Sequence, residues 1–214
     1  MLGCREPLPG VHERYTAAQW RQALGSTMHC VAGDGIGILA GAALAATLGI
    51  SGLAEGVLEY VLGFAFGWPI FQALFMRDMA GGSDVAALKS TFLSELLSMN
   101  LLMAGMMPTV MILRRRLPGA DNPTTPTFWF VMSMGLLVGF ILAYPMNWWL
   151  VANKLKHGMM TVRPAHAHAA ASHDQMAHMD MAMDAAPPLR PSLPVMTLLS
   201  FLALAAGFAI GRLP

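Results

Sequence analysis

The chain has 214 residues, of which 56% are hydrophobic and only 12% are charged, and its formal net charge is +1. A soluble domain carries roughly 25% charged residues, so this composition indicates a membrane protein. A net charge this close to zero gives no sign of a nucleic-acid partner.

Five apolar segments predict membrane-spanning helices, because each is about long enough to cross a hydrocarbon core of roughly 30 Å. They cover Ser26–Ile50, Val57–Met76, Thr91–Leu113, Phe128–Leu150 and Pro194–Ile210. The sequence therefore predicts an all-α, polytopic membrane helix bundle with four core helices in residues 26–160 and a further helix in residues 194–214. A polar, interfacial segment is expected at residues 1–25 and a disordered loop at residues 161–193.

The first span contains the motif MHCVAGDGIG, which combines His29, Cys30 and Asp34. On a helix Cys30 and Asp34 share one face at i and i+4. A carboxylate inside a span costs a few kcal/mol and normally faces a partner or a water-filled cavity, so we expect Asp34 to be functional. The same helix carries a ridge of small residues that favours close helix packing: Gly33, Gly37 and Gly41.

The third span places Glu95, Met99 and Met103 at i, i+4 and i+8. A functional interpretation makes this stripe a thioether path for a soft ion. The alternative is that methionine merely fills the core, and both interpretations stay open. Asn100 in this span and Asn147 near the end of the fourth complete the expected intramembrane polar residues, whereas Lys154 and Lys156 are expected to anchor the fourth span at the interface.

Five crossings would place the polar residues on one side of the membrane, provided that the second segment crosses. The starts of the first, third and fifth spans and the end of the fourth all meet there, and so do His29, Cys30, Asp34, Glu95 and Asn147. The balance of lysine and arginine favours a cytoplasmic N-terminus. The run Arg114–Arg116 then lies outside, against the same rule.

The loop between the fourth and fifth spans lies on that same side and contains the stretch HAHAAASHDQMAHMDMAM. Imidazole and thioether ligands together suit copper, and the sulfur favours Cu(I). The same residue types also build low-complexity linkers, so no fixed site follows from them. The candidate ligands in and before the loop are His157, His166, His168, His173, Met176, His178, Met179, Met181 and Met183.

The chain resembles an uncharacterised bacterial integral-membrane family, the domain-of-unknown-function family four-three-nine-six. The resemblance rests on four motifs within about residues 26–160: HCVAGDGIG, FGWPIFQALFMRDMAGGS, LSMNLLMAGMMP and FWFVMSMGLLVGFILAYPMNWWLVANKLKHGM. It implies a compact bundle of about four helices and supplies no activity. Against the family pattern H-C-x-x-G-C, His29, Cys30 and Gly33 match, while Asp34 stands in place of the second cysteine.

We expect a multi-pass protein of the bacterial inner membrane that binds or transports a soft transition metal, with copper as Cu(I) the best candidate. The sequence has no H-E-x-x-H, P-loop, C-x-x-C or G-x-S-x-G motif, so no enzymatic activity is expected. Two alternatives stay open. One is a membrane subunit that packs against a partner protein or a second copy through the glycine ridge, and the other is a proton-coupled small-solute carrier in which Asp34 and Glu95 titrate.

Overall fold

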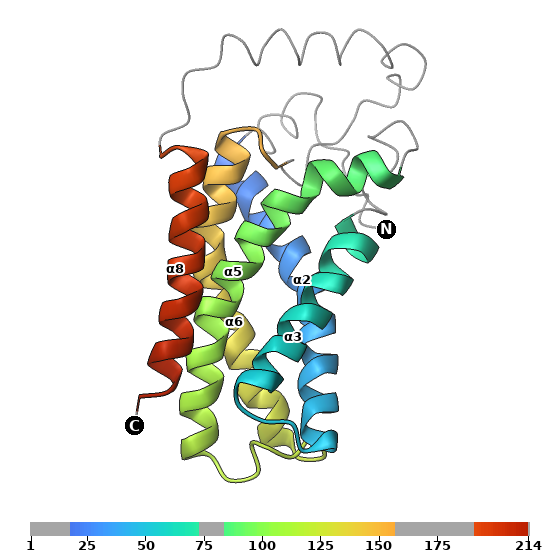
Figure 1. Ribbon diagram of the computed structural model, residues 1–214, viewed down its shortest axis with the longest axis vertical. Helices are drawn as coiled ribbons and strands as arrows, with labels where there is room; N and C mark the ends of the chain where they lie inside the picture. Colours follow the sequence, from blue (N-terminus) through green and yellow to red (C-terminus); the bar gives the residue numbers. More distant parts are fainter. Residues whose placement is uncertain (1–17, 73–83, 157–190, 214) are drawn as a thin grey trace, which may run out of the picture.

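The computed structural model describes residues 18–72, 84–156 and 191–213, and all regular secondary structure in these ranges is helical. In chain order the elements are α2 (Gln19–Leu48), α3 (Leu53–Ala65), the π-helix η1 (Phe66–Gln72), α5 (Asp84–Arg116), α6 (Pro126–Ala152) and α8 (Leu193–Gly211). By length and composition α2, α6, α8 and the Thr91–Arg116 part of α5 can each cross a membrane. The expected all-α membrane bundle is therefore confirmed (Figure 1).

The second expected span differs most from the sequence expectation. Instead of one α-helix over Val57–Met76, the chain forms the 13-residue α3 and then the seven-residue η1, and Met76 lies outside the described residues. Pro69 lies within η1. Proline has no N–H and its ring clashes with the carbonyl four residues earlier, so a wider helical turn accommodates it better.

The first helix also begins earlier than expected, at Gln19 rather than Ser26. Part of the segment assigned to the interface is therefore helical. The turn after α2 uses Gly49 as C-cap with φ +68°, a conformation that glycine adopts at little cost. After this turn α3 runs back beside α2 (Figure 1).

Glycines let the helices of the bundle touch backbone to backbone. A Cβ atom on Gly37 would lie 2.1 Å from the carbonyl oxygen of Leu62, and one on Gly139 would lie 2.5 Å from that of Leu102. No residue with a Cβ atom fits at these two positions without moving the neighbouring helix. Part of the predicted ridge on α2 is thus filled by α3 of the same chain, so a partner protein that used Gly37 would have to displace α3.

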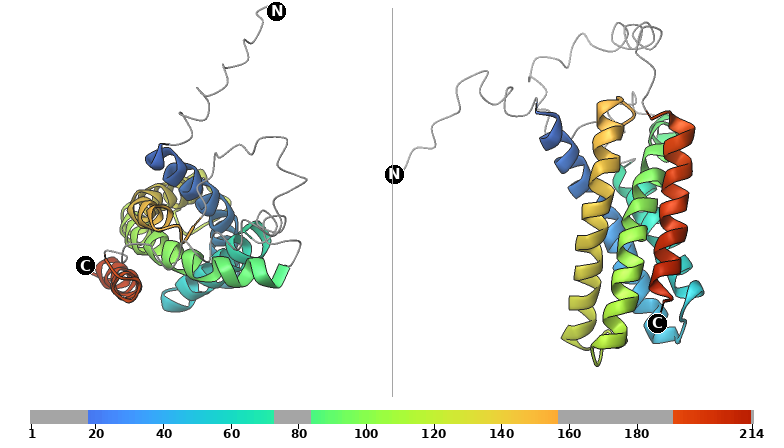
Figure 2. Two further views of the ribbon diagram at one scale, coloured as in Figure 1. Left: turned by 90° about the horizontal axis from the view of Figure 1, so that it is seen from above. Right: turned by 90° about the vertical axis from the view of Figure 1, so that its left-hand side faces the viewer.

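The C-terminal helix α8 packs on α5 at the outside of the bundle (Figure 2). A Cβ on its Gly207 would lie 2.5 Å from the carbonyl oxygen of Ala104. At its C-terminal end the Arg115 side chain donates hydrogen bonds to the carbonyl oxygens of Gly211, at 2.7 Å, and Leu213. Cationic donors there satisfy carbonyls that the helix leaves open.

Candidate functional site

Polar side chains from three helices and the chain end after α6 converge inside the bundle. The Lys156 ammonium lies 2.7 Å from Cys30 Sγ, 3.0 Å from Asn147 Oδ1 and 3.3 Å from Glu95 Oε2. Cys30 Sγ in turn lies 3.3 Å from Glu95 Oε2. Together with Asp34, which is also buried, these residues are called the polar cluster below.

The end of α6 explains why Lys156 enters the bundle instead of anchoring the helix at the surface. Lys154 has a φ of 58°, the amide of Leu155 donates to the carbonyl of Leu150 at 2.9 Å, and the amide of Lys154 donates to that of Val151 at 3.1 Å. This is a Schellman cap, with lysine where glycine is usual. Leu155 packs against the cluster that contains Leu150, so the chain turns inward and the expectation of an interfacial Lys156 is wrong.

Asn147 connects the polar cluster to α5 through its amide nitrogen. Its Nδ2 donates to Ser98 Oγ at 2.8 Å and to the Ala143 carbonyl at 3.2 Å, while its Oδ1 accepts from Lys156. Donor and acceptor functions of this fully buried amide are therefore both used. Such satisfaction orients the amide oxygen toward the ammonium and holds the acceptor in place.

The carboxyl groups of Asp34 and Glu95 face the same point on η1. A Cβ on Gly67 would lie 1.7 Å from Asp34 Oδ1 and 3.2 Å from Glu95 Oε1. Both oxygens of Asp34 and Oε1 of Glu95 are buried, and none of the residues that the structure describes forms a hydrogen bond with them. Unsatisfied buried carboxyl oxygens are costly, so this corner is the least satisfied part of the polar cluster.

Lys156 carries the cluster's only fixed positive charge, and it faces two carboxyl groups and a thiol. Its side chain is 3% exposed and that of Glu95 is 0% exposed. Burial lowers the pKa of Lys156, but the neighbouring Cys30, Glu95 and Asp34 outweigh burial, and the pKa lies above its ordinary value of 10.5. The ammonium therefore stays charged at neutral pH and balances one negative charge of the cluster.

The other intramembrane residues expected from the sequence divide into two groups. His29 is half-buried and interacts electrostatically with Glu95 and Lys156, which places it beside the polar cluster. Asn100 lies elsewhere, because it accepts from Tyr60 Oη at 2.7 Å and donates to Ser200 Oγ at 3.1 Å. Asn100 thus joins α3 to α8 through α5.

The methionines of α5 lie in the core below the polar cluster. Met99 and Met103 are fully buried, and Met107 is 5% exposed. The terminal methyl groups of Met99 and Met107 fill space over glycines of α3, since a Cβ on Gly63 would lie 2.7 Å from Met99 Cε. A Cβ on Gly56 would lie 2.6 Å from Met107 Cε.

The opposite end of α5 carries a second, partly buried arrangement of charge. Arg114 forms an ion pair with Glu55 of α3 and lies 3.7 Å from Asp121. Glu59, one turn further along α3, is 2% exposed. Two of the three arginines in the run that conflicted with the expected orientation, Arg114 and Arg115, therefore have partners within the chain.

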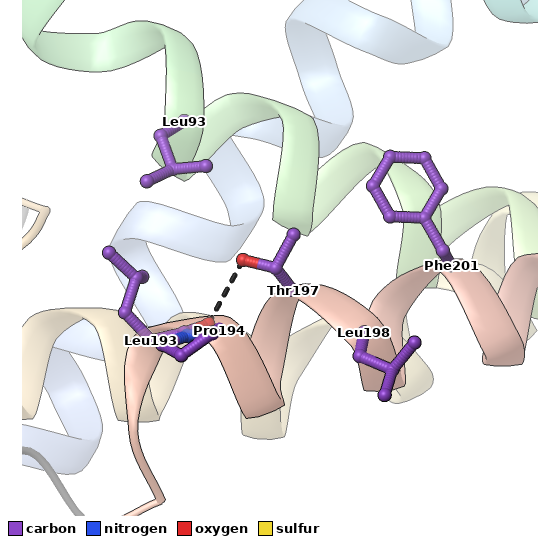
Figure 3. A pocket seen from close by; sticks show the side chains of 6 residues that line it. All are labelled: Leu93, Leu193, Pro194, Thr197, Leu198 and Phe201. Carbon is purple, nitrogen blue, oxygen red and sulfur yellow. Dashed lines mark hydrogen bonds between the residues drawn. The ribbon is translucent and has the colours of Figure 1, made fainter.

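One surface pocket lies outside the bundle, in the angle between α5 and α8 (Figure 3). It is lined by Leu93, Leu193, Pro194, Thr197, Leu198 and Phe201. The Thr197 hydroxyl donates to the Leu193 carbonyl of its own helix at 3.0 Å. This leaves an apolar surface suited to lipid chains, and the pocket has no part in the polar cluster.

Among residues 18–72, 84–156 and 191–213, no group of three or more His, Cys, Asp or Glu side chains is arranged to hold a metal ion. In the polar cluster, the Lys156 ammonium lies among Cys30, Glu95 and Asn147. The ligands expected in the loop lie outside the described residues: His157, His166, His168, His173, Met176, His178, Met179, Met181 and Met183.

Two residues of the site were missed by sequence reasoning. Gly67 gave no signal beyond its neighbour Pro69, and its role depends on the π-helical turn. Lys156 was assigned to the interface because lysines after a span commonly lie there. A usable signal was the spacing of Lys154 and Lys156, which are two residues apart. Residues at i and i+2 do not face the same direction, so the two lysines could not both point outward.

A family model described as Domain of unknown function (DUF4396) matches residues 19–156. These residues contain the whole polar cluster and end at Lys156. No curated protein and no solved structure matches the chain.

Proposed function

We propose, from the premise that the chain belongs to this family of unknown function, that it binds a soft cation inside the membrane and passes it along α5. Cu(I) is the ion whose chemistry fits best, and the bacterial inner membrane is the expected location. The observation that carries the proposal is that the Cys30 thiol contacts Glu95, whose carboxyl group faces Gly67 together with that of Asp34, at the head of a line of buried thioethers.

The thioether line supports movement rather than storage. Glu95, Met99, Met103 and Met107 repeat every fourth residue on α5 and therefore follow one face, about 6 Å apart. Thioether sulfur is a weak ligand that prefers soft ions such as Cu(I). Several weak sites in series allow an ion to enter each site and leave it again.

Charge in the cluster also favours a cation. Asp34 and Glu95 offer up to two negative charges beside the Cys30 thiol, so a monovalent cation bound there would balance one of them. At the far end of the line the Glu55–Arg114 ion pair and buried Glu59 supply a second carboxyl-rich region. Both ends of the proposed path thus contain a glutamate and a basic residue.

The histidine- and methionine-rich loop has the role of collecting the ion in this proposal. The described chain ends after Lys156 and resumes at Pro191. The end of α6 and the start of α8 lie at the same end of the bundle as the start of α2 (Figure 1). Ligands attached there raise the local ion concentration near the cluster.

Titration of the purified protein with Cu(I), and with Zn(II) for comparison, tests the proposal. We expect one tight Cu(I) site that disappears in Cys30→Ser and persists, with lower total capacity, when residues 161–190 are deleted. Zn(II) should bind mainly through the loop. Cu(I) binding no tighter than that of a free loop peptide, or unaffected by Cys30→Ser, would rule out an intramembrane copper site.

A second candidate function is proton-coupled transport of a small solute. It is favoured by the unpartnered oxygens of Asp34 and Glu95, because adjacent carboxyl groups in a dry environment are suited to hold and release a proton. Asp34→Asn and Glu95→Gln discriminate the two functions. Proton movement into proteoliposomes that disappears in both variants, while Cu(I) binding remains, would favour the carrier.

A further inference from the structure

The Lys156 ammonium contacts three different acceptors in the polar cluster. Its three acceptors are a thiol sulfur, a carboxylate oxygen and an amide oxygen, at 2.7, 3.3 and 3.0 Å. These are atom types that ligate metal ions, and they come from α2, α5 and α6. A lysine that merely compensates Glu95 does not require contact with Cys30 and Asn147 as well.

We propose that Lys156 is a built-in occupant of this cation site and must leave before an ion can bind, an inference that rests on the proposed function. An ammonium and a monovalent ion carry the same charge, so exchanging one for the other leaves the charge of the cluster unchanged. Both cannot share Cys30 Sγ and Glu95 Oε2, because two positive charges a few ångströms apart in a dry environment repel strongly.

The position of Lys156 in the chain permits this exchange. It lies beyond the last residue of α6, Ala152, after the left-handed turn at Lys154. Lys156 can therefore leave by rotation of residues 154–156 without unwinding α6. Lysine also suits a displaceable role better than arginine, since its flexible stem carries a compact, strongly hydrated charge.

Displacement gives the site a built-in selectivity. Two contributions favour entry of an ion: its own interactions with the thiol, the carboxylates and the amide, and the hydration of the released ammonium. An ion enters only if their sum exceeds the interactions that the ammonium gives up in the site. A hard monovalent ion such as Na⁺ gains little from a thiol, whereas a soft ion gains most there. Lys156 would thus reject the abundant hard cations and yield to a soft one.

Amine labelling of the wild-type protein in detergent tests the proposal directly, with Ag(I) as a soft monovalent probe that is not oxidised or reduced under these conditions. Lys154 is exposed and serves as the internal control, while Lys156 is buried. We expect Ag(I) to increase acetylation of Lys156 severalfold and to leave Lys154 unchanged. Continued protection of Lys156 at saturating Ag(I) would overturn the proposal.

A second measurement uses matched leucine and arginine variants, since leucine adds neither charge nor a metal ligand. Lys156→Leu should bind Ag(I) at least about tenfold more tightly than the wild type, because no ammonium has to be displaced. Lys156→Arg and Lys154→Leu should show no gain. Unchanged or weaker binding by Lys156→Leu would mean that Lys156 helps to hold the ion rather than competing with it.

The outcomes separate this inference from the proposed function. If the wild type binds Ag(I) at Cys30 without exposing Lys156, the cation function stands and the exchange fails. If neither the wild type nor Lys156→Leu binds Ag(I), the proposed function fails and the exchange fails with it. Binding by Lys156→Leu alone would support exchange in its strongest form.

Discussion

Lys156 Nζ lies 3.3 Å from Glu95 Oε2, and both side chains are withdrawn from the surface, at 3% and 0% exposure. The two residues are separated by 61 positions in the chain, and they meet only because α6 ends in a cap that turns inward. A buried pair of this kind is weak evidence for stability by itself, since desolvation offsets the attraction. Removing one partner is a different matter, because it leaves the other charge buried and uncompensated.

The first prediction therefore concerns the stability of this pair. Glu95→Gln and Lys156→Leu should each lower the free energy of unfolding by roughly 3–5 kcal/mol, and the double variant should lose clearly less than the sum. Thermal unfolding in one detergent measures all four proteins. Lys154→Leu is the matched control and should change stability little. Additive losses would show that the two charges do not interact.

The second prediction concerns pH. Although burial lowers the pKa of Lys156, its anionic neighbours raise it above 10.5 overall. A pKa raised on folding stabilises the folded protein below the ordinary pKa, and this contribution is lost as pH rises through the folded value. The stability advantage of the wild type over Lys156→Leu should therefore be constant from neutral pH to about pH 10 and shrink only above that. Loss of the advantage by about pH 9 would indicate a lowered pKa instead.

The third prediction concerns the close approach of η1 to the carboxyl groups. Gly67→Ala should displace the Asp34 carboxyl, because the new Cβ would lie 1.7 Å from Oδ1, and it should weaken Ag(I) binding strongly. Gly35→Ala is the control, since among the described residues its Cβ would meet Leu136 alone, at 3.6 Å, an ordinary contact. Binding is measured by competition with a chelator. Equal behaviour of the two variants would show that the Asp34 corner takes no part in binding.

The fourth prediction concerns the attachment of α8. Asn100→Leu removes the hydrogen bonds to Tyr60 and Ser200, and both hydroxyl groups lose their partner at position 100. The free energy of unfolding should therefore fall by about 1–3 kcal/mol for each lost hydrogen bond. Thr197→Val serves as control, because Thr197 donates only within its own helix. Thermal unfolding compares the two. A loss in Thr197→Val as large as that in Asn100→Leu would mean that α8 is held by packing alone.

Much of the bundle could be predicted because membrane helices are specified locally. Apolar runs of about 20 residues must satisfy their own backbone hydrogen bonds, and only a helix does so within one segment. The exception was the second span, where Pro69 replaces part of the α-helix by a π-helix. A proline inside a span interrupts the α-helical hydrogen bonds, but the helical form that accommodates it depends on the packing around it.

The candidate site was only partly accessible from the sequence. Cys30, Asp34 and Glu95 stood out because polar groups in a span are costly, whichever partners they have. Asn100 stood out for the same reason, and yet it belongs to the contact between α3 and α8. The free-energy cost of burying a polar group makes such a residue conspicuous in the sequence, but the geometry of the helices decides with which group it pairs.

The histidine- and methionine-rich composition of residues 166–183, the apolar spans and the carboxyl groups within them follow from the sequence by itself, because composition and spacing along one chain define them. Only the tertiary structure decided that an ammonium sits among Cys30, Glu95 and Asn147. The reason is a single left-handed residue, Lys154, which reverses the chain after α6 and sends Lys156 inward. Residues 126 positions apart, Cys30 and Lys156, become neighbours through that turn and the packing of three helices.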